Sequence, residues 1–206
     1  MHHNIVIIDY GMGNLNSVKR KFHRIGVNAE ITSNPSDIIK AEKIVLPGVG
    51  HFQKAVENLK HLQLWDALNT AVLIKKTPIL GICLGMQLMA KTSEEGEVAG
   101  LGWFDAEVIR FRIKDTLKYK VPHTGWNHVE VKKDSPIFDN VNLDTGFYFV
   151  HAYHLKCNES TDILNETVYE YPFVSAIQKD NIIGLQYHPE KSHDAGEQLL
   201  RNFVKI

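Results

Sequence analysis

The sequence has few cysteines and no long apolar run. Among its 206 residues only Cys83 and Cys157 are cysteines, so at most one disulfide could form. The longest apolar stretches, such as residues 5–8 and 78–83, have the length of a strand, whereas a helix needs about 20 apolar residues to cross a bilayer. Residues 1–4 include no basic or long apolar leader. We therefore expect no membrane contact and no signal peptide.

An excess of charge of one sign is also missing. The net charge is −1, which gives no general electrostatic attraction to nucleic acid or to an anionic membrane. We expect neither as a partner. There are no internal repeats and no low-complexity tracts, and 44% of the 206 residues are hydrophobic. This length and composition suit one domain with a sizeable core, so we expect a single domain over residues 1–206.

Two nucleotide-binding motifs are absent. There is no P-loop, and Gly11-Met12-Gly13 completes only part of a dinucleotide fingerprint, because Asn16 stands where the third glycine would be. The spacing of His151, His154 and Cys157 could suggest a metal site. A strand over this segment would, however, point His151 and His154 to opposite faces. We expect neither a cofactor nor a bound metal.

What is present is an alternation of apolar strands and helices in the first half. Strands are predicted over residues 4–9, 27–32, 43–46 and 78–82, with helices between them. This order indicates an α/β fold with a mostly parallel central sheet flanked by helices. The second half has the pattern of short strands separated by turns, which is typical of antiparallel pairing, and it ends in a helix. Its predicted strands are 103–111, 127–131, 146–153, 167–171, 174–179 and 181–187, and the helix is 194–205.

The most informative segment is Gly81-Ile82-Cys83-Leu84-Gly85. It follows an apolar run directly and precedes a helix-forming stretch over residues 84–90. This is the strand, sharp turn and helix of a nucleophile elbow, with cysteine in place of serine. The start of a helix favours a thiolate at such a corner. The alternative is a small buried cysteine in a glycine-rich turn.

A base for this thiol is available near the end of the chain. Residues 182–187 predict a strand that runs into His188-Pro189-Glu190. A cysteine nucleophile needs a base, and the base needs a group to orient it. In an extended chain His188 and Glu190 lie on the same side. We predict Cys83 as nucleophile, His188 as base and Glu190 as the orienting carboxylate; the alternative is an ordinary surface turn.

A glycine loop supplies the third element of this chemistry. The strand at residues 43–46 ends in Gly48-Val49-Gly50. An acyl-transfer intermediate carries an oxyanion that backbone N–H groups must meet. The N–H of Leu84, next to the nucleophile, is one donor, and the loop can offer the second. The alternative is an ordinary turn between a strand and a helix, where glycine is common.

Taken together, these three segments resemble the class I, triad-type glutamine amidotransferases, which have a flavodoxin-like sheet. The resemblance implies that the cysteine attacks the side-chain amide of glutamine, that a glutamyl thioester forms and that ammonia leaves. It also implies that Gln87 and the backbone around His151 help to hold the substrate, and that Leu84 and the loop form the oxyanion hole. It spans nearly the whole chain.

A narrower set of segments resembles one family within this class, the glutaminase subunits of imidazole glycerol phosphate synthases. The segments are residues 9–15, 122–127 and 147–153. The resemblance implies a heterodimer with a (β/α)₈-barrel cyclase subunit, which uses the ammonia in histidine biosynthesis. It also implies that Tyr10, Met12, Asn14 and Trp126 lie at the partner interface. Independently, we expect no second domain in a chain of this length, so the chemistry that uses the ammonia is expected on another chain.

Three alternatives remain open at this point. The chain could serve another synthase, such as the pyridoxal phosphate system, or it could be a cysteine hydrolase acting on peptides. It could also be a non-catalytic scaffold, although the intact Cys83, His188 and Glu190 weigh against that. Since the mechanism needs a free Cys83, a reducing cytoplasm is the expected location.

Overall fold

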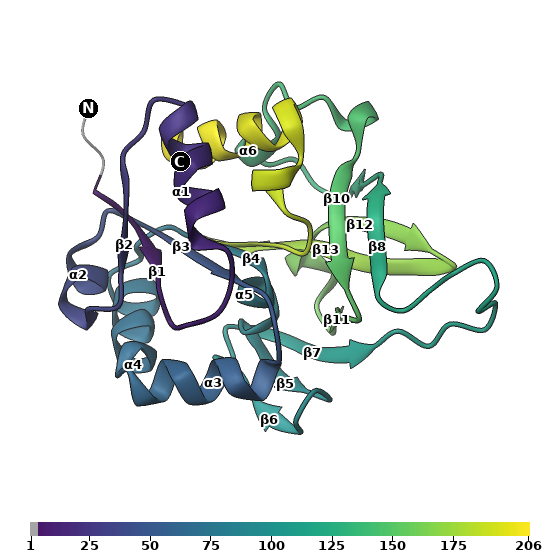
Figure 1. Ribbon diagram of the computed structural model, residues 1–206, viewed down its shortest axis with the longest axis horizontal. Helices are drawn as coiled ribbons and strands as arrows, with labels where there is room; N and C mark the ends of the chain where they lie inside the picture. Colours follow the sequence, from purple (N-terminus) through teal and green to yellow (C-terminus); the bar gives the residue numbers. More distant parts are fainter. Residues whose placement is uncertain (1–3) are drawn as a thin grey trace.

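The computed structural model describes residues 4–206. The expectation of no leader therefore falls partly on residues 1–3, which lie outside the described part. Within residues 4–206, no helix combines the length and apolarity that spanning a membrane would take. The strands and helices follow one another along the chain in the order shown in Figure 1.

The parallel half of the sheet is built from the first half of the chain together with β14 and α6 from its end, and it has helices on both faces. Strands β2, β1, β3, β4 and β14 lie side by side in that order, and each neighbouring pair is parallel. Their bounds are β1 Ile5–Ile8, β2 Ala29–Thr32, β3 Lys43–Gly48, β4 Ile79–Cys83 and β14 Ile182–Leu185. Helices α1 (Leu15–Arg24) and α6 (His193–Lys205) cover one face, and α2 (Pro35–Lys40), α3 (Phe52–His61) and α4 (Leu64–Asn69) cover the other (Figure 1).

Alternation of side chains along the central strands builds a core on each face. In β1, Val6 and Ile8 join the core beneath α2 to α4, whereas Ile5 and Ile7 join the core beneath α1 and α6. All four residues are buried. A strand with apolar residues at every position can therefore bury all of them only at the centre of a sheet covered on both sides, as the sequence predicts.

The helix boundaries also follow the sequence signals. The Asn14 side chain accepts a hydrogen bond from the Ser17 N–H at 3.2 Å and begins α1. Gly26, with φ of +80°, ends the turn after it, because this backbone conformation costs glycine little. Asn34 begins α2 in the same way. Residues 70–74, in the helical region predicted between the strands 43–46 and 78–82, form one turn of π-helix after α4.

The second half continues the same sheet, mostly with antiparallel pairs. After β14 come β13, β11, β7, β5 and β6; β12 pairs with β13 and β9, while β8 and β10 form a separate antiparallel pair. The bounds are β5 Ala90–Ser93, β6 Val98–Ala99, β7 Phe104–Arg110, β8 His123–Asn127, β9 Glu130–Val131, β10 Phe147–His151, β11 Tyr153–Cys157, β12 Ile163–Tyr169 and β13 Tyr171–Lys179.

Three predictions in this region were wrong in their boundaries. The strand expected over 167–171 is the end of β12 and the start of β13, with the turn at Glu170, whose φ is +61°. The strand expected over 127–131 is two strands, β8 and β9, because the Asn127 side chain accepts a hydrogen bond from the N–H of His128 at 2.8 Å and interrupts the ladder. The strand expected over 146–153 is β10, and a second strand, β11, follows after a break at Ala152. The two strands pair with different partners, β8 and β7.

The helix expected over residues 84–90 is much shorter. Helix α5 spans Leu84–Gln87, and the chain then enters β5. The carbonyl groups that a longer helix would use internally are taken by a later segment: Leu101 donates to the Leu88 carbonyl at 2.7 Å, and Trp103 donates to that of Met89 at 2.9 Å. Since every residue from 84 to 90 is buried, this stretch also has no solvent face, which a surface helix would keep.

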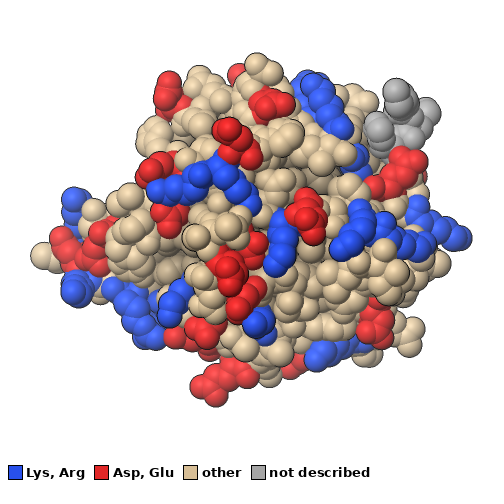
Figure 2. Space-filling model, turned by 180° about the vertical axis from the view of Figure 1, so that it is seen from behind, with Lys and Arg blue, Asp and Glu red and all other residues tan. Residues whose placement is uncertain are grey.

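Charged side chains of both signs are interspersed over the rear face of the molecule (Figure 2). Several form ion pairs between neighbouring strands or turns. Lys91 lies 2.8 Å from Asp105, and Arg112 lies 2.9 Å from Glu94. The basic residues of this strand region thus have acidic neighbours, which agrees with the net charge of −1.

Candidate active site

Cys83 occupies a strained turn between β4 and α5. Its φ is +54° and its ψ is −111°, a backbone conformation that non-glycine residues rarely adopt. The flanking glycines make the turn possible. A Cβ on Gly85 would overlap the carbonyl oxygen of Leu46, and a Cβ on Gly81 would lie 2.5 Å from the Met89 methyl. The sharp turn predicted from the sequence is confirmed.

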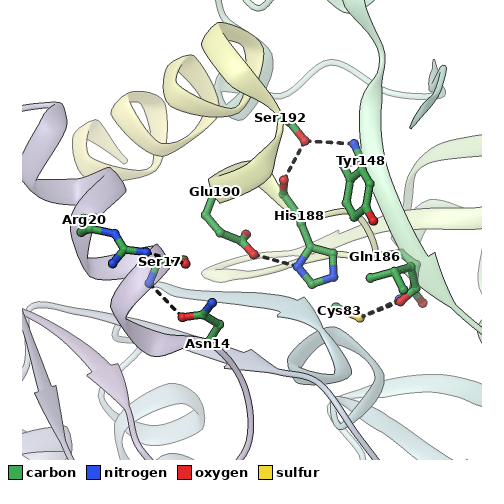
Figure 3. Close-up of polar contacts among 10 residues, drawn as sticks. Asn14, Ser17, Arg20, Cys83, Tyr148, Gln186, His188, Glu190 and Ser192 are labelled. Atoms are coloured by element: carbon green, nitrogen blue, oxygen red, sulfur yellow. Dashed lines mark hydrogen bonds and ion pairs between the residues drawn. The ribbon is translucent and has the colours of Figure 1, made fainter. Parts of the chain in front are cut away.

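His188 lies beside this turn, at the end of the strand next to β4. Figure 3 shows its imidazole between the sulfur of Cys83 and the carboxylate of Glu190. Its Nδ1 is 2.8 Å from Glu190 Oε1. The reason given from the sequence for this contact was wrong, however. Residues 189–191 form a 3₁₀ turn rather than an extended chain, and it is this turn that carries Glu190 back to the ring.

Strand β10, which lies beside the site, fixes the backbone of His188. The N–H of His188 donates to the Tyr148 carbonyl at 2.9 Å. The Ser192 hydroxyl donates to the His188 carbonyl at 2.6 Å and accepts from the N–H of Tyr148 at 3.0 Å (Figure 3). The imidazole is thus held by hydrogen bonds both to its backbone and to its ring.

The site is electrostatically polarised. Burial by itself lowers the pKa of His188, but the adjacent Cys83 and then Glu190 outweigh it, so the pKa rises to about 10. His188 is therefore an imidazolium at neutral pH, a state that favours a thiolate beside it. Its Nε2 is buried and has no hydrogen-bond partner.

A cavity of about 290 Å³ opens onto the sulfur. Most of the predicted site residues line it: Val49, Gly50, Cys83, Leu84, Gln87 and His151. Gly48 lies directly beside it, since it pairs with Cys83 in the β3–β4 register. Although Cys83 is only 5% exposed, its place on the cavity wall gives a small substrate access to the thiol.

The residues predicted at a partner interface are placed differently from one another. Trp126 is 47% exposed and stacks on His193 at 4.9 Å, while Asn14 is exposed and caps α1. Met12 is half-buried against the loop, where its methyl would lie 2.6 Å from a Cβ on Gly50. Tyr10 is fully buried, so its side chain has no surface with which to contact another chain.

The Tyr10 ring instead supports the glycine loop from below. Its hydroxyl lies so close to Gly48 that a Cβ there would overlap it. The hydroxyl has no hydrogen-bond partner, and burial and then the nearby Cys83 raise its pKa. Tyr10 therefore belongs to the support of the site.

Two site residues were missed from the sequence. The amide of Gln186 donates to Cys83 Sγ at 3.6 Å and accepts from Gln87 at 3.0 Å. It lies two residues before His188, just after β14 ends at Leu185. Glu95 also lines the cavity, and one carboxylate oxygen accepts from the N–H of Phe52 at 2.8 Å. Nothing local in the sequence indicates that the loop of Glu95 lies at the site.

The expectation that His151 and His154 point to opposite faces was wrong. The break at Ala152 changes the alternation, and both imidazoles pack against Phe111, with ring centroids 5.1 and 4.7 Å away. Both rings are buried.

The fold and the site define a class of protein, and comparison with known sequences agrees. The sequence profile of the family described as "Glutamine amidotransferase class-I" matches residues 6–206. The chain belongs to this family, and more narrowly to the HisH subunits of imidazole glycerol phosphate synthase, as its curated relatives indicate.

Two of those relatives cover almost the whole chain. "Imidazole glycerol phosphate synthase subunit HisH 2" of Methanococcus maripaludis is 49% identical over 201 residues, with 98% of each chain covered. "Imidazole glycerol phosphate synthase subunit HisH 1" of Campylobacter jejuni is 45% identical, with 98% of this chain and 100% of the relative covered.

Solved structures with low identity share the fold. One described as a glutamine amidotransferase has a TM-score of 0.74 at 17% identity and covers 97% of both chains. The structure of PurLQS from Thermotoga maritima has a TM-score of 0.73 at 13% identity, covering 100% of this chain and 99% of that one. The predicted fold class is confirmed.

Proposed function

We propose that this chain hydrolyses glutamine to glutamate and ammonia and supplies the ammonia to a cyclase partner that makes imidazole glycerol phosphate and aminoimidazole carboxamide ribotide. The observation that carries the proposal is that Cys83, on the wall of the cavity, lies beside the imidazole of His188, which Glu190 holds at 2.8 Å. Membership in the HisH family supports the same reaction.

The first half of the reaction forms a thioester. The Cys83 sulfur attacks the side-chain amide carbon, and a C–S bond forms while the carbonyl oxygen gains negative charge. The N–H of Leu84 and an N–H from the Gly48–Gly50 loop are the proposed donors to that oxygen. His188 gives its proton to the amide nitrogen, the C–N bond breaks and ammonia leaves.

The second half restores the enzyme. His188, now neutral, takes a proton from water, and the resulting hydroxide attacks the thioester carbon. The C–S bond breaks, glutamate is released and the thiolate returns beside the imidazolium. Glu190 keeps the ring oriented throughout, because it holds Nδ1 at 2.8 Å.

Glu95 and Gln87 are the proposed substrate-binding side chains. The carboxylate of Glu95 on the cavity wall suits the α-ammonium group of glutamine. Gln87 donates a hydrogen bond to the Tyr153 carbonyl at 3.0 Å, and this bond fixes the part of the cavity wall that Tyr153 forms. Replacement Glu95→Gln should raise the KM for glutamine more than it lowers kcat, whereas an equal effect on both constants would contradict a binding role.

The proposed partner is a (β/α)₈-barrel cyclase subunit, joined in a heterodimer. Support comes from the relatives, which are named as subunits of a synthase, and from the exposed Trp126 on β8. β8 pairs with β10, so Trp126 lies opposite Tyr148, whose carbonyl holds the His188 backbone. A cytoplasmic location is proposed as well, since both cysteines are free.

The test of the function is Cys83→Ala in the complex with the cyclase. We expect glutamine-dependent synthesis to be lost and ammonia-dependent synthesis to be kept. A glutamine-analogue electrophile should label the wild-type chain, and mass mapping should place the label on Cys83. Glutamine-dependent synthesis that survives the substitution would refute the proposal.

The same preparation tests whether the glycine loop is reset by the partner. Glutaminase turnover is measured for the chain alone, with the cyclase, and with the cyclase and its acceptor substrate. We expect the rate to rise along this series, because a loop that is aligned only in the complex prevents wasteful hydrolysis. Equal rates in all three would discard this gating.

A further inference from the structure

Three histidines outside the catalytic triad are buried in the antiparallel half: His123, His151 and His154. Two of them lie one behind the other at the cavity wall. His151 lines the cavity, and its Nε2 is 3.1 Å from the Nδ1 of His123. These two residues are a cross-strand pair of β8 and β10. The chemistry proposed above uses neither imidazole.

The hydrogen bonds at one end of this pair fix its polarity. His151 Nδ1 is 2.7 Å from the Tyr153 carbonyl oxygen. A carbonyl only accepts, so Nδ1 carries the proton. In a neutral ring Nε2 is then an acceptor, which requires His123 to donate from Nδ1. His123 Nε2 must in turn accept.

The other end of the pair agrees with this polarity. The Asn127 side-chain nitrogen is 3.4 Å from His123 Nε2 and donates to the Val168 carbonyl at 3.0 Å. Its side-chain oxygen accepts from the N–H of His128. The orientation of the Asn127 amide is therefore set by two backbone groups, and it presents a donor to His123. Each contact has one donor and one acceptor.

The surroundings keep both rings neutral. His123 lies between the rings of Phe149 and Tyr169, with centroids 4.9 and 4.1 Å away. Burial lowers the pKa of His123 to about 4. For His151 burial is again the main cause, and its pKa lies well below the usual value. A second proton on His151 would place two N–H donors against each other across 3.1 Å.

The chain of bonds ends on the segment that faces the substrate. The Tyr153 carbonyl accepts from both His151 and Gln87. In the same segment the Val150 carbonyl lies 3.8 Å from Cys83 Sγ, and residues 150–153 line the cavity. Fixing the Tyr153 carbonyl therefore fixes the wall against which glutamine would bind.

We propose that His123 is a positioning residue for the glutamine site, and that it acts through His151 in a chain of fixed polarity from Asn127 to the Tyr153 carbonyl. Both imidazoles work as neutral rings protonated on Nδ1. The role in glutamine binding rests on the proposed function, whereas the tautomers do not. A residue that served only for packing would be replaced without loss by another aromatic ring.

The tautomers are read directly by nitrogen NMR of the full-length chain at pH 7, with signals assigned by removing each histidine in turn. We expect His123 and His151 to be neutral with the proton on Nδ1. Either ring found with its proton on Nε2, or doubly protonated, overturns the proposal. This measurement needs no activity, so it separates failure of this inference from failure of the glutaminase assignment.

Kinetics test the positioning role with matched variants. His123→Phe keeps a ring but removes the donor, and we expect the KM for glutamine to rise roughly three- to tenfold, as for the loss of one hydrogen bond, with kcat changed less. His123→Asn places an amide nitrogen near the former Nδ1 and should restore much of the KM. His154→Phe is the control, because His154 is equally buried but bonds to the Leu155 carbonyl and the Tyr171 hydroxyl instead.

A wild-type KM in His123→Phe, or an equal rise in the His154→Phe control, would overturn the positioning role. Should His123→Phe fail to fold, Asn127→Asp tests the same chain from its half-exposed end. It replaces the terminal donor by an acceptor, so a proton should appear on Nε2 of His123 in the NMR spectrum and the KM should rise. An unchanged tautomer and KM in Asn127→Asp would contradict the proposal.

Discussion

The parallel and the antiparallel halves of the sheet position the site in different ways. In the parallel half, apolar packing and close backbone contacts hold Cys83 in its strained turn, and Gly85 touches the Leu46 carbonyl directly. In the antiparallel half, buried polar groups hold the surroundings of His188. Three such groups form a run that ends at the Tyr187 hydroxyl: Thr167, Ser175 and Asn165. The position of Cys83, the proposed nucleophile, depends on close packing, and that of His188, the proposed base, depends on hydrogen bonds.

The largest loss of stability in the parallel half is expected from Gly85→Ala. The added methyl would overlap the Leu46 carbonyl oxygen, and the backbone of β3 cannot yield easily. We expect the free energy of unfolding, measured in urea, to fall by about 3 kcal/mol or more. Gly26→Ala is the control, since no atom lies within 4 Å of its Cβ and only the left-handed backbone costs about 1 kcal/mol. Equal losses would show that close contact at Gly85 is unimportant.

The contribution of hydrogen bonding to the base is tested by Glu190→Gln. The neutral amide no longer supports the imidazolium, so we expect the glutaminase kcat to fall roughly 10²-fold or more, with stability changed much less. Glu166→Gln is the comparison. Glu166 forms an ion pair with Lys132 at 3.1 Å and does not line the cavity, so its replacement should leave kcat within about twofold. A wild-type kcat in Glu190→Gln would rule out the orienting role.

The polar run of the antiparallel half is tested by Asn165→Ala. Asn165 is fully buried; it donates to the Tyr187 hydroxyl at 3.1 Å and accepts from Ser175 at 2.7 Å. Truncation leaves both hydroxyls without these bonds, and we expect a loss of about 1–3 kcal/mol in unfolding experiments. The exposed Asn158, bonded to Asp105 at 3.0 Å, serves as control, and its replacement by alanine should cost less than about 0.5 kcal/mol.

A more gradual effect is a loss of stability in mild acid. The folded protein binds a proton at His123 only near pH 4, whereas the unfolded chain binds it near the ordinary value of 6.5. Between these values the unfolded state holds more protons, so unfolding becomes easier as the pH falls from 6.5 to 4. Urea midpoints measured across this range should decline, and the decline should be smaller in His123→Asn. The same slope in both proteins would contradict the assignment.

His188 acts in a different pH range, with the opposite sign. Its pKa in the folded protein is about 10, above the ordinary 6.5. The stability that it contributes is thus fully present below pH 6.5 and is lost as the pH rises toward 10. The contributions of His123 and His188 to stability can therefore be distinguished by the pH range in which each is lost.

Local signals predicted the parts of the site that depend on backbone chemistry. Glycines on both sides of Cys83 indicated the sharp turn, and Asn14 and Gly26, which bound α1, are signals of the same local kind. These features could be predicted because a capping side chain or a left-handed turn acts within a few residues. The short α5 could not, since carbonyl groups at its end are taken by residues from 101 onward.

Contacts between distant segments explain the remaining misses. Glu95 reaches the cavity because its loop bonds to the start of α3, and Tyr10 is buried beneath the glycine loop rather than exposed. Neither residue has a neighbour in sequence that reveals this. The contact between His188 and Glu190 was predicted, but from the wrong backbone conformation, because the 3₁₀ turn depends on packing against α6.

By itself the sequence determined the alternation of strands and helices, the strained position of Cys83 and the choice of His188 as its proposed base, since each is encoded by residues adjacent in the chain. Only the tertiary structure decided which polar groups surround them. The pairing of His123 with His151, the amide of Gln186 on the sulfur and the carboxylate of Glu95 in the cavity all join segments far apart in sequence. Burial makes each of these contacts matter, because a polar group removed from water must find its partner within the fold.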